Sequence, residues 1–182
     1  MALTATIYNF DIQLAHVDRQ VYESLSLRVA CHPSETPEYL LTRVLAYCLE
    51  YAEGITFSRG LSDPEEPPIT IRDLTGTMKV WIEIGAPDAA RLHKASKSAP
   101  RVVVYIHKDP MVLLRTWAAA TIHKADRIEL YAIDRDLLDE LVRKLDRRTK
   151  FDLSVTDGEL YIDLGGKSYT GAVERLTLPA PS

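Results

Sequence analysis

The chain has 182 residues, of which 46% are hydrophobic and 26% charged, and these shares are typical of one soluble globular domain. The formal net charge of −4 excludes a basic surface over the whole molecule, so nucleic-acid binding would need a local basic patch. The N-terminus lacks the pattern of a signal peptide, and no apolar run is long enough to span a membrane. With two cysteines at no disulfide or metal spacing, we expect a cytoplasmic, monomeric protein without membrane contact.

The first part of the chain predicts a β-hairpin followed by an amphipathic helix. Thr4–Ala15 and Val21–Cys31 are rich in β-branched and aromatic residues, partly alternate with polar ones, and are separated by a polar turn. Thr36 and Pro37 are typical of a helix N-terminus. Apolar residues then recur at helical spacing, which predicts a helix over Pro37–Ala52.

Strands and helices alternate through the middle of the chain. Strands are predicted at Ile55–Ser58, Ile69–Arg72, Met78–Ile84, Arg101–His107 and Arg127–Ile133. Helices are predicted between the later strands and after the last, at Pro87–Ser98, Met111–Thr121 and Asp134–Leu145. The acidic, proline-rich run 59–68 resists regular structure and is predicted to be a surface loop.

The C-terminal part predicts a second hairpin, Phe151–Val155 with Glu159–Leu164, and a last strand, Tyr169–Leu178. Alternating strands and helices between two hairpins favour an α/β fold (α+β, with a mixed sheet) in one compact domain over residues 1–182. The run Gly165–Ser168 ends like a phosphate-binding P-loop, but a further glycine is missing and no helix is predicted after it. We therefore reject that motif.

Three carboxylates and a lysine occur in an order that points to phosphodiester chemistry. Glu38 lies in the first turn of a predicted helix, Asp73 ends a predicted strand, and Glu83 lies within the next strand. Lys94 lies on the helix that follows. Carboxylate oxygens suit Mg²⁺ or Mn²⁺, which activates water and polarises a phosphate, and a lysine stabilises the developing charge.

This order resembles that of the PD-(D/E)XK nuclease superfamily, and several segments resemble the YaeQ family in particular. The matching segments are Ala2–Tyr8, His32–Thr36, Gly60–Asp63, Glu66–Pro67, Asp73–Gly76, Trp81–Gly85 and Arg91–Ala95. The resemblance covers most of the chain. It implies a variant restriction-endonuclease-like core with added β-hairpins and leaves the activity of the protein open.

From this order we expect a metal-dependent phosphodiesterase acting on an unidentified nucleic acid. Asp73 and Glu83 would hold Mg²⁺ or Mn²⁺, with Glu38 binding directly or through water. Asp73, Glu83 and Lys94 would be the catalytic residues. The backbone phosphates would be contacted by Arg91, Lys97 and Arg101.

One position departs from the nuclease pattern. A lysine is expected two residues after Glu83, where side chains face the same way, and this chain has Gly85 there. Lys94 is our first candidate to replace it from the neighbouring helix, and Lys79 is a weaker one. The missing lysine also supports a second hypothesis, in which the protein is a non-catalytic, nucleic-acid- or transcription-associated module that retains the nuclease fold.

Each site residue also has a simpler structural explanation. Glu38 favours the helix dipole in any protein, and Asp73 before Leu-Thr-Gly can cap a turn. Glu83 would be explained by an exposed strand face, and Lys94 by a solvated helix face. A third hypothesis is thus a structural protein whose acidic residues bind nothing.

Overall fold

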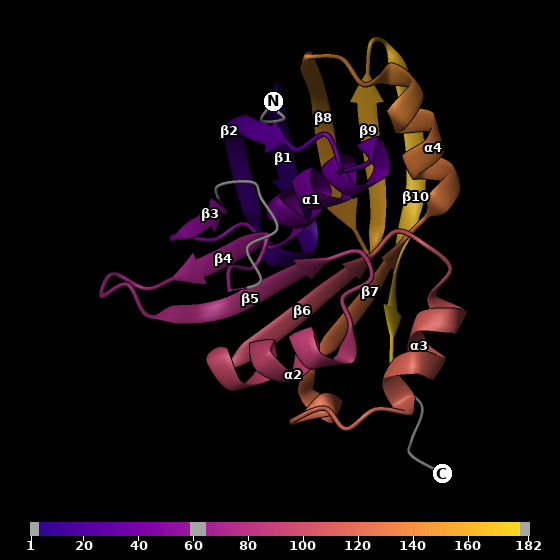
Figure 1. Ribbon diagram of the computed structural model, residues 1–182. Coiled ribbons are helices and arrows are strands. Elements are labelled where there is room, and N and C mark those ends of the chain that lie inside the picture. The colour runs from indigo at the N-terminus through magenta and orange to yellow at the C-terminus, as the bar shows by residue number, and fades with distance from the viewer. Residues whose placement is uncertain (1–3, 59–64, 179–182) are drawn as a thin grey trace.

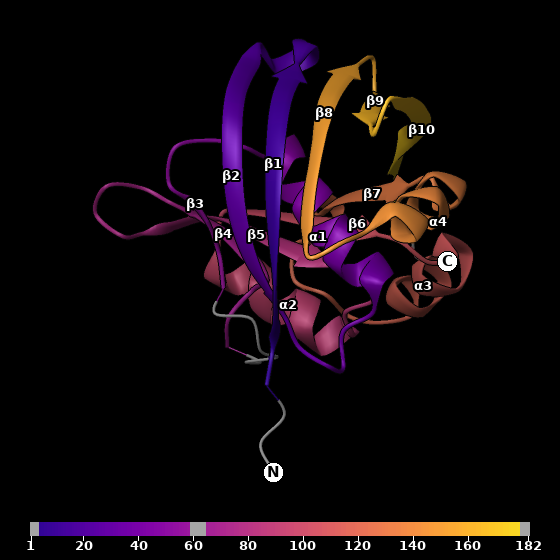
Figure 2. The ribbon, with the colours of Figure 1, turned by 90° about the horizontal axis from the view of Figure 1, so that it is seen from above.

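The computed structural model describes residues 4–58 and 65–178, and within them ten strands form one mixed sheet (Figures 1 and 2). Along the sheet the strand order is β2-β1-β8-β9-β10-β7-β6-β5-β4-β3. The sheet curves until it is nearly closed, and helix α1 (Pro37–Leu49) lies on its concave side. This confirms the predicted mixed α/β class.

Both ends of the chain contribute to one half of the sheet. Strands β1 (Thr6–His16) and β2 (Val21–Cys31) form the predicted antiparallel hairpin, joined by a short 3-10 turn. Strand β1 also pairs in parallel with β8 (Arg148–Thr156), which begins a C-terminal meander with β9 (Glu159–Leu164) and β10 (Lys167–Leu176). The pairing of β1 with β8 therefore joins the N-terminal hairpin to the C-terminal strands.

The middle of the chain forms the other half of the sheet. Its strands are β3 (Ile55–Phe57), β4 (Ile69–Arg72), β5 (Met78–Ile84), β6 (Arg101–Ile106) and β7 (Glu129–Ile133). Its later helices are α2 (Ala89–Ser98), α3 (Pro110–Ala118) and α4 (Arg135–Lys144). Strands β5, β6 and β7 run parallel, so their carboxyl ends meet at one edge of the sheet.

Two hydrophobic clusters cover the two faces of this half. On the concave face, α1 packs with side chains of β1, β2, β5 and β8, and its Leu40 and Val44 are fully buried. On the other face, Trp81 of β5 and Trp117 of α3 pack with α2. Neighbouring residues Val80 and Trp81 belong to different clusters, as the predicted alternation along β5 requires.

Several element boundaries differ from the predicted ones by two or three residues, and local hydrogen bonds explain two of them. Helix α2 begins at Ala89 instead of Pro87, because the side chain of Asp88 accepts a hydrogen bond from the backbone N–H of Arg91 at 2.8 Å. Strand β7 begins at Glu129, because residues 125–127 form a 3-10 turn. Within the described part of the chain, no helix is long and apolar enough to cross a membrane.

The turn between α1 and β3 depends on a glycine. Gly54 has a φ of +88°, and a Cβ at this position would lie 2.0 Å from the carbonyl oxygen of Arg72. Its own carbonyl oxygen accepts a hydrogen bond from the N–H of Arg72 at 3.2 Å. A side chain at residue 54 therefore cannot fit without moving β4.

We expect Gly54→Ala to lower the free energy of unfolding by clearly more than Gly76→Ala. Gly76 has a similar φ of +86°, but its Cβ would meet nothing within 4 Å, so it measures the cost of backbone strain alone. That cost is about 1–2 kcal/mol. Urea denaturation of both variants checks this, and equal losses would show that the close approach to β4 relaxes freely.

Candidate functional site

The carboxyl ends of β5 and β6 lie against the N-terminus of α1, and a glycine allows this approach. Gly85 follows β5 with a φ of +90°, and its N–H donates to the carbonyl oxygen of Tyr105 at 2.8 Å. A Cβ on Gly85 would lie 3.3 Å from Nε2 of His107 and 3.7 Å from the ring of Tyr39. Glycine therefore keeps open the space in which the sequence pattern expects a lysine.

A cavity of about 370 Å³ opens at this point, and we call it the edge pocket. Ligands of open α/β sheets commonly bind outside the carboxyl ends of the parallel strands. The pocket is lined by the loop before α1, the first turn of α1 and the residues after β5 and β6. These residues are His32, Ser34, Glu35, Thr36, Tyr39, Gly85, Ala86, His107 and Lys108.

Two side chains of the edge pocket remain uncharged near neutral pH. Burial lowers the pKa of His107, the charge of Lys108 lowers it further, and Glu38 partly offsets the shift. Burial, followed by the charge of Glu83, raises the pKa of Tyr39 to about 12. The pocket can therefore offer a neutral imidazole and a phenol as hydrogen-bonding groups.

Glu83 lies behind this pocket and is only 4% exposed. Its Oε2 accepts hydrogen bonds from Nε1 of Trp81 at 2.9 Å and from Nε of Arg91 at 2.7 Å. Burial raises the pKa of this carboxyl, although Arg91 and Trp81 act in the opposite direction. An exposed strand face therefore does not explain Glu83, because the carboxylate is enclosed and paired with a guanidinium.

Asp73 does not lie with Glu83. Its Oδ1 accepts hydrogen bonds from the backbone N–H groups of Thr75 and Thr77 at 2.9 and 3.0 Å, as in an Asx-type turn. The hydroxyl of Thr75, and then these backbone N–H groups, lower the pKa of Asp73. Because Thr77 precedes β5 and Glu83 lies near its far end, the two acids are about 20 Å apart along the strand.

Glu38 and the candidate lysines have different surroundings. Glu38 lies in the first turn of α1, close enough to His107 to raise its pKa, and is therefore at the same edge as Glu83. The amine of Lys94 pairs with Glu65, a residue of the acidic run predicted to be surface. Lys79 is 3.6 Å from Asp73 and so belongs to the distant turn.

The three predicted phosphate-binding residues are also separated. Arg91 pairs with Glu83, and its Nη2 donates to the carbonyl oxygen of Glu66 at 2.9 Å. Arg101 lies at the amino end of β6 and is bound by two carboxylates, Glu50 and Glu129. Lys97 is exposed in the last turn of α2, so it is the predicted phosphate contact that faces solvent.

The described residues do not fit Mg²⁺ or Mn²⁺ in this arrangement. Within residues 4–58 and 65–178, no three His, Cys, Asp or Glu side chains are grouped closely enough to hold a metal ion. Glu83 and Glu38 share an edge of the sheet, Asp73 does not, and the guanidinium of Arg91 already neutralises Glu83. A metal ion at Glu83 would compete with the guanidinium of Arg91 for the same carboxylate.

Several residues of the edge pocket were not singled out from the sequence. Tyr39 has the spacing of a helix face, and His107 has no metal-ligand spacing to another histidine in the sequence. A usable signal was present, since His107 and Lys108 directly follow a buried parallel strand, where functional residues of α/β sheets gather.

The raised pKa of Glu83 makes its contribution to stability depend on pH. Above pH 4.5, the ordinary pKa of glutamate, the carboxyl of Glu83 stays protonated to a larger extent in the folded protein than in the unfolded chain. The free energy of unfolding therefore falls as the pH rises through the raised pKa. We therefore expect the free energy of unfolding of the wild type, relative to Glu83→Gln, to decrease as the pH rises above the ordinary glutamate value of 4.5. Urea denaturation over this range measures it, with Glu140→Gln on α4 as the control. A difference that increases with pH would show that Arg91 outweighs burial.

Similarity to known proteins, in sequence and in structure, identifies the family of this chain. The family model described as YaeQ protein matches residues 1–173. The uncharacterised YaeQ protein of Escherichia coli K12 is 31% identical over 89% of this chain and 90% of its own length. The crystal structure of YaeQ protein from Pseudomonas syringae has a TM-score of 0.87 at 31% identity, covering 95% of this chain and 96% of that one. That of YaeQ protein from Xanthomonas axonopodis pv. citri has a TM-score of 0.86 at 31% identity, covering 97% and 100%. With its sequence and its fold matched over nearly their full lengths, the chain is a member of the YaeQ family.

Proposed function

We propose that the protein is a non-catalytic module that binds nucleic acid. Its contact surface would run along α2. The observation that carries this proposal is a group of basic side chains at the C-terminal end of α2 with no acidic partner among the described residues. It consists of Lys97, Lys124 and Arg127.

Contacts between α2 and the loop before β7 hold this group together. The N–H of His123 donates to Nδ1 of His93 at 3.0 Å, and the two imidazole rings meet edge to face. Burial and the charges of Lys124 and Lys97 lower the pKa of His123, so these groups are close enough to interact. His123 therefore adds a polar, largely uncharged group beside the lysines near neutral pH.

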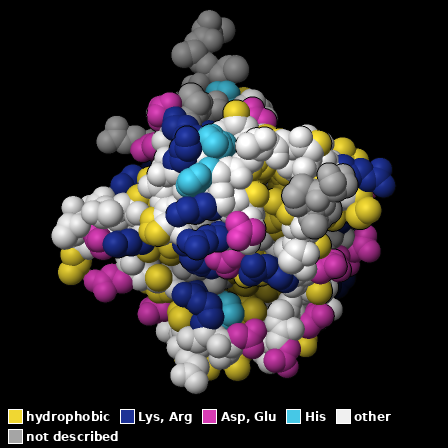
Figure 3. All heavy atoms as spheres, turned by 90° about the horizontal axis from the view of Figure 1, so that it is seen from below, with side chains coloured by type: hydrophobic (Ala, Val, Ile, Leu, Met, Phe, Trp, Pro, Cys, Tyr) yellow, Lys and Arg dark blue, Asp and Glu magenta, His cyan; other side chains and the backbone are white. Residues whose placement is uncertain are grey.

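The basic group continues toward the edge pocket. Figure 3 shows a band of Lys and Arg side chains, with histidines beside it, across the face of the molecule where α2 lies. Arg91 lies in the first turn of α2 and Lys97 in its last, so basic residues occur along the whole helix. A band of this length, about 15 Å, suits the backbone of a few nucleotides rather than a long duplex.

The net charge and the acidic neighbours limit how strongly this surface binds. Glu65 neutralises Lys94, and Glu83 neutralises Arg91, which leaves few positive charges for phosphates. We therefore expect weak, salt-dependent binding of single-stranded nucleic acid with little base specificity.

The double variant Lys97→Glu, Lys124→Glu should weaken binding of a short labelled single-stranded DNA or RNA by about ten-fold or more. It should also reduce the slope of log K against log salt by about two, one for each lost phosphate contact. Fluorescence anisotropy in low salt measures both. The matched control is Arg143→Glu, Lys167→Glu, which reverses two charges at the opposite end of the molecule, on α4 and at the start of β10 (Figure 1). Equal losses in both double variants, or no binding by the wild type, would contradict the proposal.

A second candidate function is metal-dependent hydrolysis of a phosphodiester. It is favoured by one observation, the enclosed carboxylate of Glu83 at the end of a parallel strand with Glu38 at the same edge. For this function, Arg91 would have to leave Glu83 and Lys108 or Lys94 would have to supply the missing amine.

Calorimetric titration with Mn²⁺ separates the two functions. On the first proposal, the wild type shows no binding tighter than about 1 mM. Binding in the micromolar range, about −8 kcal/mol, that disappears in Glu83→Gln would favour the hydrolase. Arg91→Gln provides a further comparison, because removing the guanidinium should strengthen any binding that depends on Glu83.

A further inference from the structure

A second cavity, of about 420 Å³, lies at the other end of α1, and we call it the network pocket. Its walls come from both halves of the curved sheet and from the C-terminus of α1. The lining residues are His16, Asp18, Arg19, Leu49, Glu50, Arg101, Tyr105, Tyr131, Val155, Gly158 and Val173. A volume of this size is within the range of small-molecule sites.

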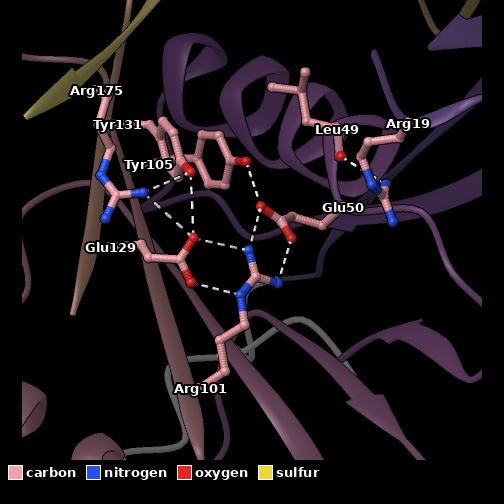
Figure 4. A network of polar contacts seen from close by, with 8 residues as sticks. All are labelled: Arg19, Leu49, Glu50, Arg101, Tyr105, Glu129, Tyr131 and Arg175. Atoms are coloured by element: carbon pink, nitrogen blue, oxygen red, sulfur yellow. Dashed lines mark hydrogen bonds and ion pairs between the residues drawn. The ribbon is translucent and has the colours of Figure 1, made fainter. Parts of the chain in front are cut away.

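One wall is a polar network whose charges are balanced (Figure 4). Arg101 donates to Oε2 of Glu50 at 2.8 Å and to Oε2 of Glu129 at 2.5 Å. The hydroxyl of Tyr105 donates to Glu50 at 2.6 Å, and Arg175 lies 3.5 Å from Glu129. Both carboxylates therefore have cationic partners, and this wall is fixed before any ligand enters.

Outside this network, the pocket has a cationic hydrogen-bond donor, Arg19, without a carboxylate partner in the described part of the chain. Arg19 donates through Nη1 to the carbonyl oxygen of Leu49 at 2.9 Å, and no carboxylate of the described residues lies within ion-pair distance of it. The neighbouring carboxylate of Asp18 instead accepts from the N–H groups of Asp157 and Gly158 at 2.9 and 3.3 Å. Arg19 is therefore a cation at the pocket mouth that lacks a charged partner.

His16 lies deeper in the same pocket and is only 6% exposed. Its Nδ1 is buried and has no hydrogen-bond partner among the described residues. Leaving such an atom unpaired is unfavourable, so a ligand toward which the imidazole can turn and donate would be favoured. Burial, and then the charge of Arg19, lower the pKa of His16, which places the two groups within electrostatic reach of each other.

We propose that the network pocket binds a small organic acid. Its carboxylate would pair with Arg19 beside the imidazole of His16, and that ring would turn toward the cavity to donate an N–H to it. Its apolar body would pack against Leu49, Val155 and Val173. The nearby acids Glu50 and Asp18 are held by Arg101 and by two backbone N–H groups respectively, which leaves Arg19 available to the ligand.

Benzoate and benzamide test this proposal, since they share a shape and differ in charge. By calorimetry, we expect benzoate to bind the wild-type protein with a dissociation constant of about 1 mM or lower and benzamide at least about ten-fold more weakly. Benzoate should also shift the imidazole NMR signals of His16. Arg19→Gln should weaken benzoate binding by about ten-fold, whereas Arg28→Gln, an exposed position on β2, should leave it unchanged.

Three outcomes would overturn the proposal. Equal affinity for benzoate and benzamide would show that charge is not recognised. Benzoate binding without a change in the His16 signals would place the ligand elsewhere. Wild-type affinity in Arg19→Gln would exclude the guanidinium as the anion partner. The benzoate–benzamide comparison uses the wild type alone, so it stands even if a variant is unstable.

Discussion

The burial of α1 inside the curved sheet is the constraint on which the rest of the structure depends. A sheet this curved needs side chains to fill its concave face, and α1 supplies them with Leu40, Val44 and Leu45, which are almost completely buried. Even its one arginine is enclosed: Arg43 is 2% exposed and donates to the carbonyl oxygens of Ala30 and Ser58 at 3.2 and 3.3 Å. Both halves of the sheet are thus held to the same helix.

The position of α1 also creates both pockets. Its N-terminus, capped by Thr36, forms one wall of the edge pocket beside the carboxyl ends of β5 and β6. Its C-terminus, at Leu49 and Glu50, forms one wall of the network pocket. A helix inside a nearly closed sheet leaves space mainly at its two ends, because side chains fill the space along its length.

The pair of Glu83 and Arg91 links the fold to the proposed function. A buried carboxylate needs a partner, and removing one member of a buried pair costs about 3–5 kcal/mol. Arg91 meets that need from the first turn of α2, and its guanidinium also lies 5.5 Å from the ring centre of Trp81. The same contact that completes the core therefore withdraws from solvent both an acid predicted to bind metal and a base predicted to bind phosphate. In the proposed function, the exposed basic group farther along α2 would carry the interaction with nucleic acid.

The sequence by itself determined the elements, because their signals are local. Alternation placed β1, β2, β4 and β5 within a few residues, and Thr36 with Pro37 placed the start of α1, since capping and periodicity act over one or two turns. The family was also recognisable, because its motifs are short and contiguous.

Only the tertiary structure decided which charged residues meet. Asp73 and Glu83 are ten positions apart in the sequence, yet an antiparallel hairpin separates them to opposite ends, while it brings Glu66 near Arg91. Arg101 likewise contacts Glu50 and Glu129, which lie far from it and from each other in the sequence. No local pattern predicts these contacts, because they depend on how the sheet curves.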